Sequence, residues 1–262
     1  MARRLIDISV ALKAGIASDP EYMRPKIDYE NHQQTAPRMA EYFGIRVDQM
    51  IDGEGSAVER CNISSHNGTH MDAPYHFAST MNHAVKPGGE PSWRIDDVPL
   101  DWCFQPAVKL DFRHFDDGYV ATAGDVEAEL KRIGHTLKPL EIVVVNTRAA
   151  SRYGEDDFID TGCGMGRAAT LWLLERGVRV VGIDGWSWDA PFSHTKKRVA
   201  ETGDASLVWE GHKAGRDIGY FQMEKLTNLD KLPPDGFEIV AFPVKVHRAS
   251  AGWTRAVAIL PE

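Results

Sequence analysis

Three histidines and one aspartate fall within eleven residues of this chain, at His66, His70, Asp72 and His76. Imidazole and carboxylate groups at such close spacing are the ligands from which a chain builds a site for a divalent metal ion. An ion held only by nitrogen and oxygen atoms can generate a hydroxide nucleophile at neutral pH. The cluster therefore predicts a metal site and indicates hydrolysis as the reaction.

The residues between the histidines indicate how the cluster is shaped. Gly68 allows a tight turn, and Pro74 argues against one regular helix through the whole segment. His70 and Asp72 are two residues apart, so in extended backbone they face the same side. Asp72 has two carboxylate oxygens and could bridge two ions. Pro74 suits the start of a short helix that would place His76 beside the metal, free to carry protons.

A second group of ligands must come from elsewhere, because three protein ligands can hold only one ion. The candidates are Glu210, His212 and Glu224. His212 lies at the end of a predicted helix, and Glu224 shares one face of a predicted strand with Tyr220 and Gln222. Spacing alone does not join these residues to the histidine cluster.

The hydrophobic pattern predicts strands alternating with helices. Strands are expected over residues 5–10, 58–63, 107–112, 141–146, 178–184, 218–224, 238–246 and 254–260. Helices are expected over residues 38–43, 122–134, 167–176 and 205–214. The strand, helix and strand between residues 140 and 184 predict a parallel pair, and the later strands predict a mixed sheet. We expect an α/β protein in which residues 1–262 form a single domain, with a polar, turn-rich excursion at about 13–56.

Composition limits the classes of partner. The net charge is −8 and no dense basic stripe is present, which argues against nucleic acid; the only basic run, at 196–198, is interpreted as a solvated loop. No segment approaches the ~18 apolar residues that a membrane helix needs. The first residues lack the apolar segment of a secretory signal, and Cys61, Cys103 and Cys163 are far apart. We therefore expect a cytoplasmic protein with reduced thiols and a small-molecule substrate.

The cluster His66-x-Gly68-Thr69-His70-x-Asp72-x-Pro74-x-His76 resembles the signature of the metal-dependent cyclase family, which contains bacterial kynurenine formamidases and isatin hydrolases. Other segments resemble this family too. They are the opening Ile6-Asp7-Ile8-Ser9, the central Asp184-x-x-Ser187-x-Asp189, and His212 with Glu224, Leu226, Asn228 and Leu229.

This resemblance implies a swivelling β/β/α fold, a homodimer or homotetramer, and one or two Zn²⁺ or Mn²⁺ ions. The side chains implied as metal ligands are His66, His70, Asp72, His212 and Glu224. Asp72 would be shared between two ions, and His76 would be the general acid/base.

The central segment departs from the family pattern by its aromatic residues. Trp186 and Trp188 are expected to widen the substrate pocket; the alternative is packing in the core or between subunits. We therefore predict hydrolysis of an amide C–N or lactone C–O bond in a small cyclic or aryl substrate, by attack of metal-bound hydroxide. The alternatives are an arylformamidase acting on N-formylkynurenine, a cyclase or lyase, and a non-catalytic metal-binding protein.

Overall fold

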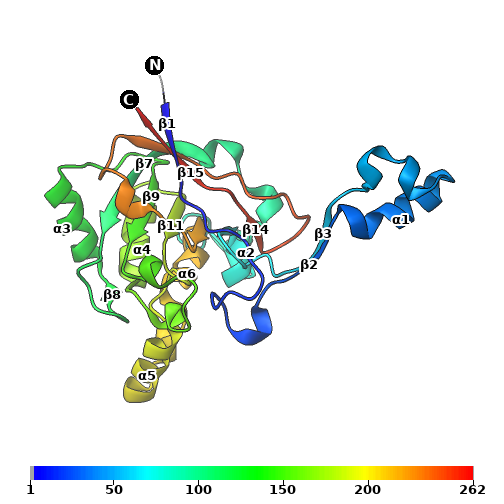
Figure 1. Ribbon diagram of the computed structural model, residues 1–262. Helices are drawn as coiled ribbons and strands as arrows, with labels where there is room; N and C mark the ends of the chain where they lie inside the picture. Colours follow the sequence, from blue (N-terminus) through cyan, green and yellow to red (C-terminus); the bar gives the residue numbers. More distant parts are fainter. Residues whose placement is uncertain (1–2, 262) are drawn as a thin grey trace.

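A mixed nine-stranded sheet organises the computed structural model, which describes residues 3–261 (Figure 1). Its central strands are parallel: β7 (Phe104–Asp111), β9 (Ile142–Asn146), β11 (Val180–Ile183) and β12 (Phe221–Glu224). Antiparallel strands flank them, with β13 (Phe237–Val240), β15 (Val257–Pro261) and β1 (Arg3–Asp7) on one side and β4 (His70–Asp72) and β14 (Ala251–Trp253) on the other. The predicted α/β class with a mixed sheet is confirmed.

Both faces of the sheet are buried. In β9, Val143 and Val145 pack against the helices of one face, whereas Ile142 and Val144 belong to the core on the other face. The first of these faces is covered by α3 (Ala123–Ile133) and α4 (Arg167–Glu175). Burial on both sides explains why this parallel strand is a continuous apolar run rather than an alternating one.

Helix α3 shows why the sequence pattern located its ends well. The Thr122 side chain accepts a hydrogen bond from the Asp125 backbone N–H, and the Asp125 carboxylate accepts one from the Thr122 backbone N–H. Gly134 ends the helix in the left-handed conformation, with φ of 71°.

An arm projects from the body of the molecule (Figure 1). It consists of β2 (Lys26–Glu30), α1 (His32–Phe43) and β3 (Val58–Asn62), with β2 and β3 paired antiparallel. The strand expected at 58–63 therefore exists, but it pairs with β2 in the arm and does not belong to the main sheet. Helix α1 is longer than expected, because a capping box at Asn31 starts it well before Pro37.

Several other segments differ from the sequence-based expectation. The helix expected at 205–214 is broken by Trp209, whose φ is 58°, so that only a 3-10 turn (Ala205–Leu207) and the short α6 (Glu210–Lys213) form. The basic run at 196–198 lies in a helix, α5 (Phe192–Thr202), and not in a loop. The strand expected at 238–246 ends at Val240, and β14 precedes the last predicted strand.

The remaining elements are short. Strand β5 (Thr80–Met81) pairs with β6 (Glu90–Pro91), and β8 (Val120–Ala121) pairs with β10 (Gly164–Met165). The predicted short helix at Pro74 is α2 (Pro74–Phe77). Across residues 3–261, no helix has the length and apolar character needed to span a bilayer.

Candidate metal centre and active site

The pairing of β4 with β12 builds the floor of the site. In this antiparallel register His70 lies opposite Glu224, and Asp72 lies opposite Gln222. Because side chains alternate along a strand, these four share one face, while the intervening methionines of both strands are buried in the core on the other face. Two segments about 150 residues apart thus bring an imidazole, two carboxylates and an amide together.

His66 and His76 approach this floor from either end of β4. Gly68 adopts a φ of 61° in the turn before β4, as the predicted tight turn requires. His66 Nδ1 then lies 2.8 Å from Asp72 Oδ1, and its Nε2 lies 3.1 Å from Ser250 Oγ. Helix α2 carries His76, whose Nε2 is 4.0 Å from Asp72 Oδ2.

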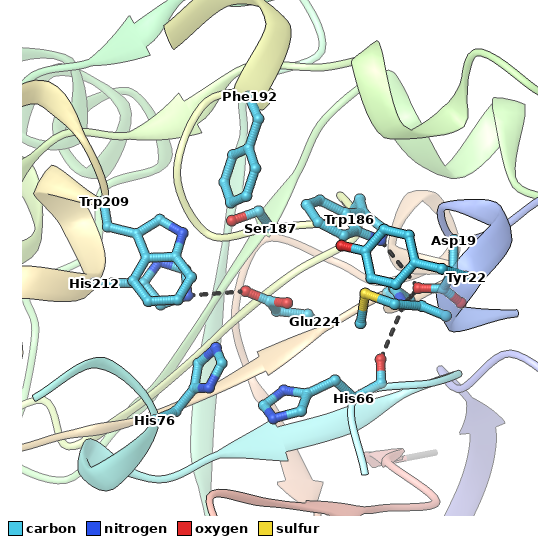
Figure 2. A pocket seen from close by; sticks show the side chains of 12 residues that line it. Asp19, Tyr22, His66, His76, Trp186, Ser187, Phe192, Trp209, His212 and Glu224 are labelled. Atoms are coloured by element: carbon cyan, nitrogen blue, oxygen red, sulfur yellow. Dashed lines mark hydrogen bonds and ion pairs between the residues drawn. The ribbon is translucent and has the colours of Figure 1, made fainter. Parts of the chain in front are cut away.

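Helix α6 contributes His212 from the opposite side (Figure 2). Its Nε2 lies 3.4 Å from Glu224 Oε1 and 4.0 Å from Asp72 Oδ2. On the other side of the ring, Nδ1 contacts the Asp189 carboxylate, which also accepts the backbone N–H groups of Gly211 and His212. This arrangement fixes the orientation of the His212 ring.

Two buried atoms at the centre are suited to a cation. His70 Nδ1 lies 2.9 Å from the Gly68 carbonyl, which can only accept, so Nδ1 carries the proton and Nε2 presents a lone pair. That Nε2 faces Asp72 Oδ1 at 3.3 Å and Glu224 Oε2 at 3.6 Å. Within residues 3–261, neither His70 Nε2 nor Asp72 Oδ1 makes a hydrogen bond of acceptable geometry, although both are buried and His66 Nδ1 lies 2.8 Å from Asp72 Oδ1. Lone pairs that face one another in this way repel unless a positive charge lies between them, so the donor set fits a metal ion.

Two groups of three side chains have ligand atoms close enough to hold one ion. One consists of His66, Asp72 and His76, and the other of His70, Asp72 and Glu224. Asp72 belongs to both groups, as expected for a carboxylate with two oxygens. Four of the five side chains that the resemblance implies as metal ligands belong to these groups, and His76 is a member of the first. His212 belongs to neither group, although its Nε2 lies 3.4 Å from Glu224 Oε1.

The charges in the site favour a cation at its centre. Burial raises the pKa of Asp72, but the neighbouring histidines outweigh burial and hold that pKa well below its usual range. Burial lowers the pKa of His212, yet Asp189 and then Glu224 raise it to about 10. His76 differs, because burial dominates and lowers its pKa to about 4. His76 is therefore neutral at pH 7 and can accept a proton.

A cavity of about 190 Å³ opens beside the cluster, and Figure 2 shows its lining. Its walls include the aromatic rings of Tyr22, Trp186, Phe192 and Trp209 together with His66, His76, His212 and Glu224. The ring of Trp209 stacks on that of His212 at 5.0 Å between centroids. The cavity is smaller than the about 300–1,000 Å³ of pockets for drug-sized ligands, so it suits a small, flat molecule.

Two expected participants lie elsewhere. Trp188 is fully buried in the core, where its indole N–H donates to Thr170 Oγ1 at 3.0 Å, so the alternative of core packing describes it. Glu210 forms an ion pair with Arg198 at 3.4 Å on the outer side of α6. Trp186, in contrast, lines the cavity as expected.

Sequence reasoning missed several residues of the site. The strand pattern puts Gln222 on the same face as Glu224 but assigns it no role, and the resemblance includes Asp189 only as part of the central segment. Asp19, Tyr22 and Lys225 also line the cavity. Asp19 and Tyr22 lie in a segment without a motif, and Lys225 lies between Glu224 and Leu226, where the resemblance gives it no role.

Comparisons with known proteins agree with this geometry. The profile of the Cyclase family matches residues 6–190. The chain is 25% identical over 257 residues to the kynurenine formamidase of Erythrobacter litoralis, covering 97% of this chain and 93% of that protein. It is 25% identical over 213 residues to the isatin hydrolase of Roseibium aggregatum, covering 76% of this chain and 73% of that protein.

Solved structures with a similar fold come from the same group of enzymes. The crystal structure of an isatin hydrolase bound to the product analogue thioisatinate superposes with a TM-score of 0.74 at 21% identity, covering 99% of this chain and 93% of that one. Fold, site and relatives together define a hydrolase of the mixed α/β class with a candidate metal centre. The chain belongs to the cyclase family.

Proposed function

We propose that this protein is a divalent-metal-dependent hydrolase that opens the amide C–N or lactone C–O bond of a small cyclic or aryl substrate. The observation that carries this proposal is the pair of buried atoms without a hydrogen bond within residues 3–261, His70 Nε2 and Asp72 Oδ1. They face His66 and Glu224, which line the aromatic-walled cavity. We propose that residues 1–262 act as one hydrolase domain.

The ligand set supports either Zn²⁺ or Mn²⁺, since its donors are imidazole nitrogens and carboxylate oxygens. We propose that His66, His70, Asp72 and Glu224 hold one ion. A bound divalent ion supplies Lewis acidity toward a carbonyl oxygen and lowers the pKa of water.

A second ion would need the space between Asp72, His212 and Glu224. The amide nitrogen of Gln222 lies in that space, 2.6 Å from His212 Nε2, 3.0 Å from Glu224 Oε1 and 3.3 Å from Asp72 Oδ2. Gln222 is held there because its Oε1 lies 2.8 Å from the Tyr220 hydroxyl, which donates to it. A second ion therefore requires Gln222 to turn away, and we propose one ion per chain.

His76 is proposed as the general acid/base. Its side chain is 22% exposed and borders the cavity, whereas those of His70 and His212 are almost fully buried. As a neutral imidazole at pH 7, it accepts a proton from the attacking water and delivers it to the leaving nitrogen or oxygen. Asp72, 4.0 Å from His76 Nε2, stabilises the protonated ring that forms in between.

The aromatic walls favour a planar substrate. The relatives named kynurenine formamidase and isatin hydrolase support an aryl amide or a cyclic amide, and the first of them supports arylformamidase activity on N-formylkynurenine as the alternative. The test is a panel of isatin, N-formylkynurenine, formanilide and a γ-lactone, assayed with Zn²⁺ or Mn²⁺ in water labelled with oxygen-18. Turnover with label in the product supports hydrolysis. Product without label indicates a lyase or cyclase, and binding of metal without turnover indicates a non-catalytic metal-binding protein.

The oligomer and the location are further proposals. The arm carries exposed apolar side chains, among them Tyr29, Tyr42, Phe43 and Ile51, which a homodimer or homotetramer would cover. Light scattering on the purified protein measures its mass, and a monomer would contradict this. The three cysteines are free thiols, in keeping with the cytoplasmic location that we propose.

A further inference from the structure

The Asp19 carboxylate joins three other segments beside the cavity. It accepts a hydrogen bond from the Trp186 indole N–H at 3.0 Å (Figure 2). It also accepts a charge-assisted hydrogen bond from Lys225 Nζ and one from Asn67 Nδ2 at 3.1 Å. The side chains of Asp19 and Lys225 are 0% and 1% exposed. Burying an ion pair costs so much desolvation that such pairs are weak sources of stability, and a role in specificity is a hypothesis to test.

Lys225 connects this carboxylate to the proposed metal ligands. It directly follows Glu224, and its backbone adopts a φ of 56°, a conformation that is uncommon for residues other than glycine. Its ammonium group also donates to the backbone carbonyl of His66 at 3.0 Å. The Lys225 ammonium group thus contacts both the segment of Asp19 and the loop of His66.

The segment held in this way forms a wall of the cavity. Residues 19–23 lie outside the main sheet, and Tyr22 and Met23 line the cavity together with His66. A further hydrogen bond holds this segment, because Asn67 Nδ2 donates to the Met23 carbonyl at 2.9 Å. Because no strand pairing fixes this segment within the described chain, its position depends on these side-chain bonds.

We propose that Asp19 and Lys225 are positioning residues that set substrate affinity. Their ion pair holds residues 19–23 as a cavity wall and orients the Trp186 ring toward the substrate. This inference rests on the proposed hydrolase function. Both side chains are almost fully buried and bonded to protein groups, so we expect them to act through the cavity wall. Their loss then weakens binding of ground state and transition state alike and raises KM more than it lowers kcat.

The test combines kinetics with hydrogen exchange in Asp19→Asn and Lys225→Met. We expect KM for the best substrate of the panel to rise roughly tenfold while kcat changes less than about threefold, with metal content unchanged. Amide exchange over residues 19–23 should become faster than in the wild type. The control is Asp156→Asn, which removes a surface ion pair to Arg24 of the same region; Asp156 is 94% exposed, and neither KM nor exchange should change.

The exchange measurement does not need turnover, so it separates this inference from the proposed function. Unchanged exchange over 19–23 in both variants overturns the positioning role, whether or not the enzyme is active. A fall in kcat at constant KM, or loss of the metal, also overturns it. If a single variant does not fold because one buried charge is left unpaired, the double variant Asp19→Asn/Lys225→Met removes both charges and must still show the raised KM and faster exchange.

Discussion

Removing the hydroxyl of Ser250 tests whether His66 is a metal ligand. Ser250 Oγ lies 3.1 Å from His66 Nε2, on the opposite side of the ring from the Nδ1 that faces Asp72. A partner of this kind holds a ligating imidazole in the orientation that the ion needs. Ser250→Ala deletes that partner and leaves every proposed ligand in place.

The size of the effect follows from the contact. One neutral hydrogen bond contributes a net ~0.5–1.5 kcal/mol, which corresponds to a loss of about two- to twelvefold in affinity. Loss of a partner to a metal ligand typically costs about 10–100-fold. Because the His66 side chain is 18% exposed, water can replace part of the lost bond. We therefore expect the Kd for Zn²⁺ to rise about tenfold, at the overlap of the two ranges.

The assay is competition for Zn²⁺ against a chromophoric chelator. Ser92→Ala is the matched control, because Ser92 is buried and its hydroxyl has no hydrogen-bond partner in the described chain. Equal affinity of Ser250→Ala and wild type would refute the reasoning. A loss far beyond a hundredfold would also refute it, since Ser250 itself would then have to be a ligand.

Three further predictions concern catalysis, pH dependence and packing. His76→Asn should lower kcat by about 10²–10⁴-fold with the metal content kept, and undiminished turnover would exclude the acid/base role. Burial lowers the pKa of His135, but hydrogen bonds to two carboxylates outweigh it and raise the pKa above 6.5. The resulting stabilisation is complete below about pH 6.5 and is lost as pH rises through the folded-state pKa; His135→Gln should flatten this loss in urea unfolding, and an unaltered pH dependence would contradict it. A Cβ on Gly164 would overlap the backbone of Asp189 and Ala190, so Gly164→Ala should destabilise by about 1–3 kcal/mol and lower Tm. Gly124→Ala, whose nearest contact would be at 3.6 Å, should not destabilise, and equal Tm values for the two variants would contradict this.

The histidine cluster was predictable because its geometry is local. His70 and Asp72 share a face through the two-residue period of a strand, and Pro74 starts the helix that carries His76. The turn at Gly68 follows from the conformational freedom of glycine. None of these features depends on another part of the chain, so the sequence alone was sufficient for them.

The second half of the site was not predictable from spacing. Glu224 reaches His70 only because β12 pairs with β4, and strand pairing at a separation of about 150 residues leaves no local trace. The sequence leaves Trp188 open between pocket and core for a related reason: it lies in an irregular segment, where alternation does not assign a side chain to the core or the cavity. The break at Trp209 and the burial of Asp19 with Lys225 likewise depend on tertiary contacts.

The most direct test of the account is a titration with Zn²⁺ or Mn²⁺ of protein from which a chelator has removed the metal. Turnover is plotted against bound metal, which is measured by elemental analysis. The account predicts that hydrolysis returns in proportion to bound metal and saturates at about one ion per chain, and that His70→Ala neither binds the ion tightly nor recovers activity. Full hydrolysis by protein that holds no divalent metal, or unimpaired binding by His70→Ala, would contradict it.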